Sequence, residues 1–271
     1  MNGILIVNHF LNSEKFSILH RHLIQSAKKQ GINLVLKTNL EMAFYNEKPD
    51  FVLFWDKDIM LAKALEQKGI PVFNSSEAIR KCDNKAETYI NLLGVVSQPK
   101  TIIAPLTFFK ADFTEFVNRA AEELGLPLVF KECFGSFGEQ VFLCRTKEEI
   151  LNHITENPFI LQKFIEEARG SDVRIEVVGG KAVCAMKREN KNDFRANITN
   201  GGTAYKYIPT AQQCETAVRA CNALGLDFGG VDIMCDDIVC EVNSNAHIIN
   251  MMNCTGVDIA PIIFEDILSK L

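Results

Sequence analysis

Apolar positions in the first quarter of the chain switch between short consecutive runs and a helical spacing. Consecutive runs predict buried strands, and a spacing of three to four predicts amphipathic helices. We expect strands at residues 3–8, 32–37, 51–55 and 70–73. We expect helices at residues 13–30 and 58–67. Strands that alternate with helices form a parallel sheet covered by helices, so residues 1–76 predict a Rossmann-like domain of the α/β class.

The remaining two thirds of the chain predict a mixed α+β organisation. Two hairpins are indicated, because Gly179-Gly180 and Asp236-Asp237 each separate two apolar runs. Strands are expected at residues 101–104, 128–132, 141–144, 158–164, 172–178, 181–188, 228–235 and 237–243. Helices are expected at residues 77–93, 113–124, 211–224 and 258–271. We expect a central domain at residues 77–160 and a C-terminal domain at residues 161–271.

Charge and cysteine usage narrow the classes of function. The formal net charge of -5 leaves no basic excess for phosphate contacts, which argues against general nucleic-acid binding. No apolar run approaches the roughly 20 residues that span a bilayer. The nine cysteines form no Cys-x-x-Cys pair, which fits buried thiols in a reducing compartment better than a zinc site. We therefore expect a cytoplasmic protein with no membrane partner.

The second predicted hairpin carries a candidate metal site. A strand period of two places Glu241 and Asn243 on one face, and antiparallel pairing brings Asp232 alongside them. Carboxylate and amide oxygens are hard ligands that suit Mg²⁺, which fills its remaining positions with phosphate oxygens and water. A solvated face of an ordinary hairpin explains the alternation equally well.

A lysine and a glycine-containing turn form a second candidate site. Lys131 ends a predicted strand, and the turn Gly135-Ser136-x-Gly138 leads into the next one. Backbone N–H groups of such a turn can surround phosphates while the lysine supplies a charge. The turn is not a Walker A loop, because no Gly-Lys-Ser/Thr follows it. An ordinary hairpin loop is the alternative.

Two further segments are consistent with nucleotide chemistry. The start of residues 162–174 can present backbone groups to an adenine edge, and Glu167 can then meet a ribose. Arg195 and Asn197 lie two positions apart in a segment that ends in glycines, where they can converge on a developing anion. Taken singly, a charged surface loop is the favoured interpretation of each segment.

In order and spacing, these pieces resemble the ATP-grasp fold, and more narrowly the RimK-like ligases, which are named for the ribosomal-protein glutamate ligase. The resemblance covers roughly residues 75–271. Each motif is weak and the ordered set is strong. The matching pieces are Asp83-Asn84-Lys85, Lys131, Gly135-Ser136-x-Gly138, residues 162–165, Gly170-Ser171-Asp172-Val173-Arg174, Asp193-Phe194-Arg195-Ala196-Asn197, Gly201-Gly202, Val231-Asp232-Ile233, Glu241-Val242-Asn243 and residues 255–260.

The resemblance implies an ATP-grasp fold behind an N-terminal Rossmann-like (pre-ATP-grasp) domain, and it implies roles for individual residues. The implied contacts of ATP are Lys85, Lys131, Gly135, Ser136, Gly138, Gln162, Lys163, Phe164, Ile165, Glu167 and Asp172. The implied ligands of two Mg²⁺ ions, with Mn²⁺ as the alternative metal, are Asp232, Glu241 and Asn243. The implied catalytic residues are Arg195, Asn197 and, on weaker grounds, Arg174.

The implied reaction is ATP-dependent ligation of a carboxylate substrate to an amine substrate. The carboxylate takes the γ-phosphoryl group, and the amine then displaces phosphate to form an amide or peptide bond. Glutamate addition to a peptide or protein is the leading precedent of the family, and a small-molecule acceptor is equally compatible. A non-catalytic ATP-binding protein of the same fold, and a phosphotransferase that stops at the phosphorylated substrate, are the alternatives. The sequence leaves the oligomeric state open.

Three positions depart from the family pattern. Lys163 stands where the family often has glutamate, and Gln140 stands where a third loop glycine is common. After Asn243 the usual Ser-Pro-Gly is replaced by Asn245-Ala246-His247, on the side that receives the acceptor in relatives. We expect this replacement to affect the choice of substrate. A structural role of His247 is the favoured interpretation, with a substrate contact or a base as alternatives.

Overall fold

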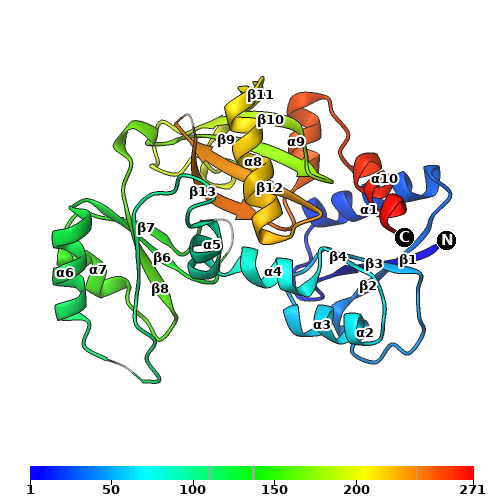
Figure 1. Ribbon diagram of the computed structural model, residues 1–271, viewed down its shortest axis with the longest axis horizontal. Helices are drawn as coiled ribbons and strands as arrows, with labels where there is room; N and C mark the ends of the chain where they lie inside the picture. Colours follow the sequence, from blue (N-terminus) through cyan, green and yellow to red (C-terminus); the bar gives the residue numbers. More distant parts are fainter. Residues whose placement is uncertain (110, 136–137, 236) are drawn as a thin grey trace.

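The computed structural model of the chain describes residues 1–109, 111–135, 138–235 and 237–271. Three sheets occupy separate regions of the molecule, and the helix Ser76–Asp83 (α4) lies between the N-terminal sheet and the other two (Figure 1). The two chain ends lie close together at one side of the molecule (Figure 1). No helix in the described part of the chain is long and apolar enough to cross a membrane.

The N-terminal sheet is parallel, with strand order β2-β1-β3-β4. Its strands are β1 (Asn2–Val7), β2 (Asn33–Thr38), β3 (Phe51–Phe54) and β4 (Val72–Phe73). Its helices are α1 (Glu14–Lys29), α2 (Asn39–Met42) and α3 (Ile59–Gln67). All four residues of β3 are buried, as a strand covered on both faces requires. Strands and helices alternate here as the apolar pattern predicts, and only the short α2 was not expected.

The central sheet is antiparallel, with order β5-β8-β6-β7. Its strands are β5 (Thr101–Ile103), β6 (Leu128–Glu132), β7 (Val141–Cys144) and β8 (Phe159–Lys163). One face is covered by α6 (Thr114–Leu124) and α7 (Lys147–His153). Helix α7 was missed in the sequence, although Thr146 forms its N-cap by accepting the Glu149 N–H at 3.2 Å. The predicted domain boundary at residue 160 lies inside β8, and the division into domains stays a prediction.

The C-terminal sheet has five strands in the order β11-β10-β9-β12-β13, and every neighbouring pair is antiparallel. Its strands are β9 (Ser171–Val178), β10 (Lys181–Glu189), β11 (Thr203–Tyr207), β12 (Phe228–Met234) and β13 (Ile238–Asn243). Its helices are α8 (Ala211–Leu224), α9 (Ile248–Thr255) and α10 (Ala260–Lys270), and two short 3-10 turns lie at Glu166–Ala168 (η1) and Ile198–Asn200 (η2). The strands of both predicted hairpins pair as expected, although Asp236 in the second turn lies outside the described residues. Strand β11 and helix α9 were not expected.

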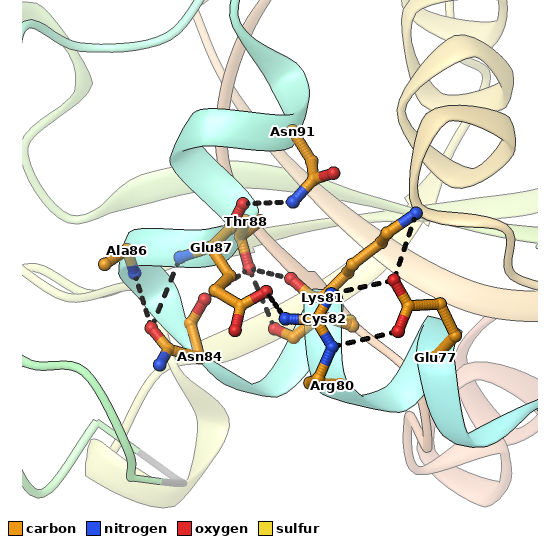
Figure 2. Close-up of polar contacts among 9 residues, drawn as sticks. All are labelled: Glu77, Arg80, Lys81, Cys82, Asn84, Ala86, Glu87, Thr88 and Asn91. Atoms are coloured by element: carbon orange, nitrogen blue, oxygen red, sulfur yellow. Dashed lines mark hydrogen bonds and ion pairs between the residues drawn. The ribbon is translucent and has the colours of Figure 1, made fainter.

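The prediction of a single helix at residues 77–93 is wrong. The chain forms two helices there, α4 and α5 (Lys85–Leu92), with a break at Asn84. The Asn84 side chain accepts the N–H groups of Ala86 and Glu87 at 2.9 and 3.2 Å and so begins α5 (Figure 2). The Thr88 hydroxyl lies 2.8 and 2.9 Å from the carbonyls of Lys81 and Cys82, at the end of α4. These contacts satisfy backbone groups that the break would otherwise leave unpaired.

The N-terminal and C-terminal sheets share one hydrophobic core, and the central sheet has its own. The shared core joins Leu5 and Leu23 to Phe228 on β12 and to Phe264 on α10. Asn74, which is fully buried after β4, reinforces this connection with four hydrogen bonds. Its amide nitrogen donates to the carbonyls of Phe228 and Ser244, both at 2.9 Å, and its oxygen accepts the N–H groups of Asp227 and Phe228.

Candidate active site

A cleft between the central and C-terminal sheets collects most of the residues expected to contact ATP. The space in this cleft, open mouth included, is about 850 Å³. Its lining includes Lys85, Lys131, Gly135, Gly138, Gln162, Lys163, Phe164, Ile165, Asp172, Arg195, Asn197, Asp232 and Glu241. These residues come from five segments that are far apart in the sequence, so their convergence is a property of the fold. Ser136, also expected at this site, lies outside the described residues.

Two lysines make one end of this cleft electropositive. Lys85 is the first residue of α5, whose first N–H groups are already paired with the Cys133 carbonyl and with Asn84. Its ammonium lies 3.4 Å from the Gly135 carbonyl, and the Lys131 ammonium lies 3.8 Å from Cys240 Sγ. Burial, with the neighbouring cations Lys131 and Lys57, lowers the pKa of Lys85 against the opposing effect of Glu241. Phosphate groups fit this end of the cleft.

Arg195 connects the glycine turn to the C-terminal sheet. Its guanidinium pairs with the Asp193 carboxylate at 2.7 Å and donates to the Gly138 carbonyl at 2.5 Å. Gly138 has φ +75°, and a side chain there would come within 3.4 Å of Arg195 Cδ. Gly138 and Arg195 therefore depend on each other for position.

A row of buried charges lines the face of the C-terminal sheet toward the site. Arg174 donates two hydrogen bonds to Asp232, at 2.6 and 2.7 Å, and Arg188 donates two to Asp172, both at 2.7 Å. Arg188 also pairs with Asp232 at 2.8 Å. Burial alone would raise the pKa of Asp232, but the two guanidinium groups hold it below its usual value.

The predicted metal ligands lie together on the paired strands β12 and β13, beside this row of charges. Strand register places Asp232 directly opposite Glu241 and Gly230 opposite Asn243. Asn243 Nδ2 is buried with no hydrogen-bond partner in the described part of the chain, and as a donor it fits an oxygen of a bound ligand, whereas only Asn243 Oδ1 could coordinate a metal ion. Asp232 already accepts three hydrogen bonds from arginine and has little capacity left. No cluster of three or more His, Cys, Asp or Glu side chains that could hold a metal occurs among the described residues.

Residues 63–267 match the RimK-like ATP-grasp domain. The chain belongs to the RimK-like ATP-grasp family. It is 33% identical over 226 residues to the uncharacterized protein MG012 homolog of Mycoplasma pneumoniae, covering 79% of this chain and 78% of that one. It is 32% identical to human N-acetylaspartylglutamate synthase A, covering 80% of this chain but 57% of the synthase. It is 35% identical to a probable alpha-L-glutamate ligase of Trichodesmium erythraeum, covering 76% of this chain and 70% of that one.

Solved structures confirm the predicted ATP-grasp fold, which combines parallel and antiparallel sheets. A RimK domain protein from Sphaerobacter thermophilus superposes with a TM-score of 0.73 at 22% identity, covering 98% of this chain and 99% of that one. The D-cycloserine synthetase DcsG superposes with a TM-score of 0.79 at 13% identity, covering 100% and 99%. The chain is therefore an ATP-grasp ligase by family and by fold.

We call the cleft between the central and C-terminal sheets the nucleotide cleft. Some of the residues expected in the site of this RimK-like ligase lie outside it. Glu167 is exposed on η1, and it is absent from the cleft lining that the described residues form. Asp172 lines the cleft, but its carboxylate is engaged by Arg188. Arg174 faces a second cleft, where it is paired with Asp232. The second cleft also holds Asn243.

The second cleft lies between the N-terminal and C-terminal sheets and contains residues that the sequence did not single out. Its space, open mouth included, is about 1560 Å³. Asn8, Asp56 and Lys57, which follow β1 and β3, contribute polar groups to it. The ammonium of Lys57 pairs with Asp83 at 3.1 Å, and Asp83, despite burial, raises the pKa of Lys57. Polar residues directly after two parallel strands were the signal that could have indicated this cleft.

His247 lines the second cleft beside α1. Its ring contacts Phe16 edge to face, with centroids 6.1 Å apart. Burial and the nearby charge of Lys15 lower its pKa to about 4, so the ring is neutral near pH 7. A neutral ring against an aromatic wall is consistent with the structural role that we expected, and its role stays a prediction.

Glu176 lies on the same face of the C-terminal sheet as Asp172 and Arg174, and its pKa allows a test of how burial affects stability. It is 3% exposed, and burial raises its pKa to about 7. The protonated form therefore contributes stability that is fully present below about pH 4.5 and is lost as the pH rises through 7. Because glutamine stays neutral, the free energy of unfolding of E176Q relative to wild type should increase by up to ~3 kcal/mol between pH 4.5 and 8. Urea titrations at the two pH values measure this, and an unchanged difference would contradict it.

Proposed function

We propose that the protein joins a carboxylate substrate to an amine substrate through an acyl phosphate, with ADP and phosphate as the other products. The observation that carries the proposal is the meeting of two clefts. Asn197 and Glu241 line both the nucleotide cleft and the second cleft. A γ-phosphate held in the first cleft and a carboxylate held in the second can therefore meet beside these two residues.

The described side chains support definite roles in this reaction. Lys85 and Lys131 hold the phosphates, and backbone groups at residues 162–165 hold the adenine. Glu241 and Asn243, with Asp232 behind them, hold Mg²⁺, which when bound neutralises charge on the transferring phosphoryl group. Arg188 and Asp172 fix the orientation of Asp232. We keep Glu167 as a ribose contact that depends on movement of η1.

The chemistry proceeds in two displacements. The substrate carboxylate attacks the γ-phosphorus, the bond to the β-phosphate oxygen breaks, and ADP forms. The neutral amine then attacks the acyl carbon, the bond between that carbon and the phosphate oxygen breaks, and the proton that the amine loses leaves with the phosphate as the amide forms. Asn197, which lines both clefts, and Arg195, which lines the nucleotide cleft beside it, stabilise the oxyanion of the second step. Arg195 also donates to the Gly138 carbonyl and so fixes Gly138 at the wall of the nucleotide cleft.

Glutamate is the substrate that the relatives favour. The names of a synthase and of a ligase among them specify glutamate as one of the joined groups. We propose glutamate as one partner here, with a peptide, protein or small acid as the other. We also propose a reducing, cytoplasmic location, because the nine cysteines are all free thiols and five of them are at least partly exposed.

An ADP-release assay tests the proposed function. With ATP and Mg²⁺, the wild-type protein should release ADP only when an acid and an amine are both present, and mass spectrometry should detect an amide. N-acetyl amino acids supply carboxylates without free amines, and the twenty L-amino acids supply amines. Removal of Mg²⁺ with EDTA should stop the release. A stable phosphorylated acid without amide would favour the phosphotransferase instead, and ATP binding without any turnover would favour a non-catalytic protein.

A further inference from the structure

The N-terminal sheet has a feature that the nucleotide chemistry leaves unused. Its order β2-β1-β3-β4 reverses direction between β1 and β3, because the chain leaves β1 on one side for β2 and returns on the other for β3. Ligands of parallel sheets bind outside the carboxyl ends of the strands at such a reversal. Asn8 follows β1 there, and Asp56 follows β3 by two positions. Both line the second cleft.

Asp56 is a buried carboxylate with unused capacity to accept hydrogen bonds. It is 6% exposed. Its oxygens accept the amide of Asn8, at 3.1 and 3.3 Å, and the backbone N–H of Lys57 at 2.7 Å. An ionised carboxylate has about four acceptor positions, so room remains for a further donor.

No described lysine or arginine forms an ion pair with Asp56. Lys57, the next residue in the chain, pairs its ammonium with Asp83, although its charge still acts to lower the pKa of Asp56. A buried carboxylate without a cationic partner is costly, and burial accordingly raises the pKa of Asp56. A cation that enters the cleft would relieve this cost, and it would do so beside the residues that carry the proposed reaction.

We propose that Asp56, oriented by Asn8, binds the ammonium group of the amine substrate. The proposal rests on the proposed ligase function and specifies the side from which the amine enters. The present contacts of Asp56 come from only two nitrogens, the Asn8 amide that both oxygens share and the Lys57 N–H, so one N–H of an ammonium group can be accepted as well. Glu241, Asn197 and Arg174 line the same cleft as Asp56. The bound ammonium releases one proton to solvent, and the neutral amine then attacks the acyl group formed in this cleft. The substrate is thus a primary amine that is charged when it binds, such as an amino acid.

A surrogate nucleophile separates this role from the rest of the reaction. Hydroxylamine is largely uncharged at pH 8 and traps an acyl phosphate as a hydroxamate without needing an ammonium site. The variant D56N retains the size of the side chain and an oxygen for the Lys57 N–H. We expect kcat/KM for the best amino-acid amine to fall about 10- to 100-fold, mainly through KM. Hydroxamate formation from the same N-acetyl amino acid should change less than twofold.

Asp50 supplies the matched control at the opposite end of the same strands. Its carboxylate accepts the backbone N–H of Asn2 at 2.7 Å, away from the cleft. D50N should leave both reactions unchanged. Equal losses of amide and hydroxamate in D56N would overturn the inference, because they would indicate a structural role for Asp56. Hydroxamate in wild type without amide from any amino acid would also overturn it, whereas no ADP and no hydroxamate would contradict the ligase function itself.

Discussion

Replacement of Glu241 by glutamine should lower kcat for ADP formation about 10³-fold, which corresponds to ~4 kcal/mol of transition-state stabilisation. Glu241 lines both clefts, and it lies directly opposite Asp232 in the strand register. Glutamine retains the shape but supplies no charge to a metal ion. Its thermal unfolding should stay close to that of wild type, because Glu241 forms no ion pair with the described residues. Steady-state ADP release across a range of Mg²⁺ concentrations measures the effect.

The exposed residue Glu265 on α10 provides the control for this variant. E265Q makes the same chemical change far from the clefts and should retain full activity. Excess Mg²⁺ should partly restore turnover in E241Q, since a weakened site fills at higher concentration. Full turnover in E241Q at low Mg²⁺ would rule out Glu241 as a ligand.

Replacement of Asp232 by alanine should destabilise the protein by about 3–5 kcal/mol, because it leaves the largely buried Arg174 without its partner. Arg188 would keep Asp172 and lose only its second contact. A loss of this size should lower the melting temperature by roughly 10 °C. Differential scanning calorimetry in the absence of ATP measures stability apart from function.

A double variant shows whether the unpaired charge is the cause. D232A/R174M removes both charges and should recover part of the lost stability. E115A, which breaks the exposed pair with Arg119, is the control and should change stability by less than ~1 kcal/mol. If D232A proved as stable as E115A, the charge row would not contribute to folding.

Local patterns predicted most of the fold, and tertiary contacts explain the misses. The break at Asn84 was missed because apolar spacing continues from α4 into α5, although the Asn84 cap followed by Glu87 was a visible start signal. Helix α9 was missed because Ile248, Ile249 and Met251 are buried on several sides and leave little polar periodicity. Strand β11 has mostly exposed or half-buried residues, so it lacks the apolar run that predicts a strand.

The candidate site was predictable where one motif supplied the chemistry, as at Lys131 or Glu241. It was not predictable where two strands had to align. Arg188 belongs to the charge row only because β10 pairs with β9 so that Arg188 faces Asp172. Asp56 was missed for a similar reason, since its position beside Asn8 follows from the pairing of β1 with β3. Register between distant strands is not encoded in any short pattern.

The four hydrogen bonds of Asn74 determine which part of the molecule can move. They join the end of β4 to β12 and to the residue after β13, and the shared core makes these two sheets one body. The central sheet has a separate core around Phe130, Phe159 and Leu128. Opening of the nucleotide cleft should therefore be a rotation of residues 101–163 alone, while the second cleft keeps its shape. ATP would then enter a cleft whose width changes as the central sheet rotates. The other substrates would enter the second cleft, whose shape does not change.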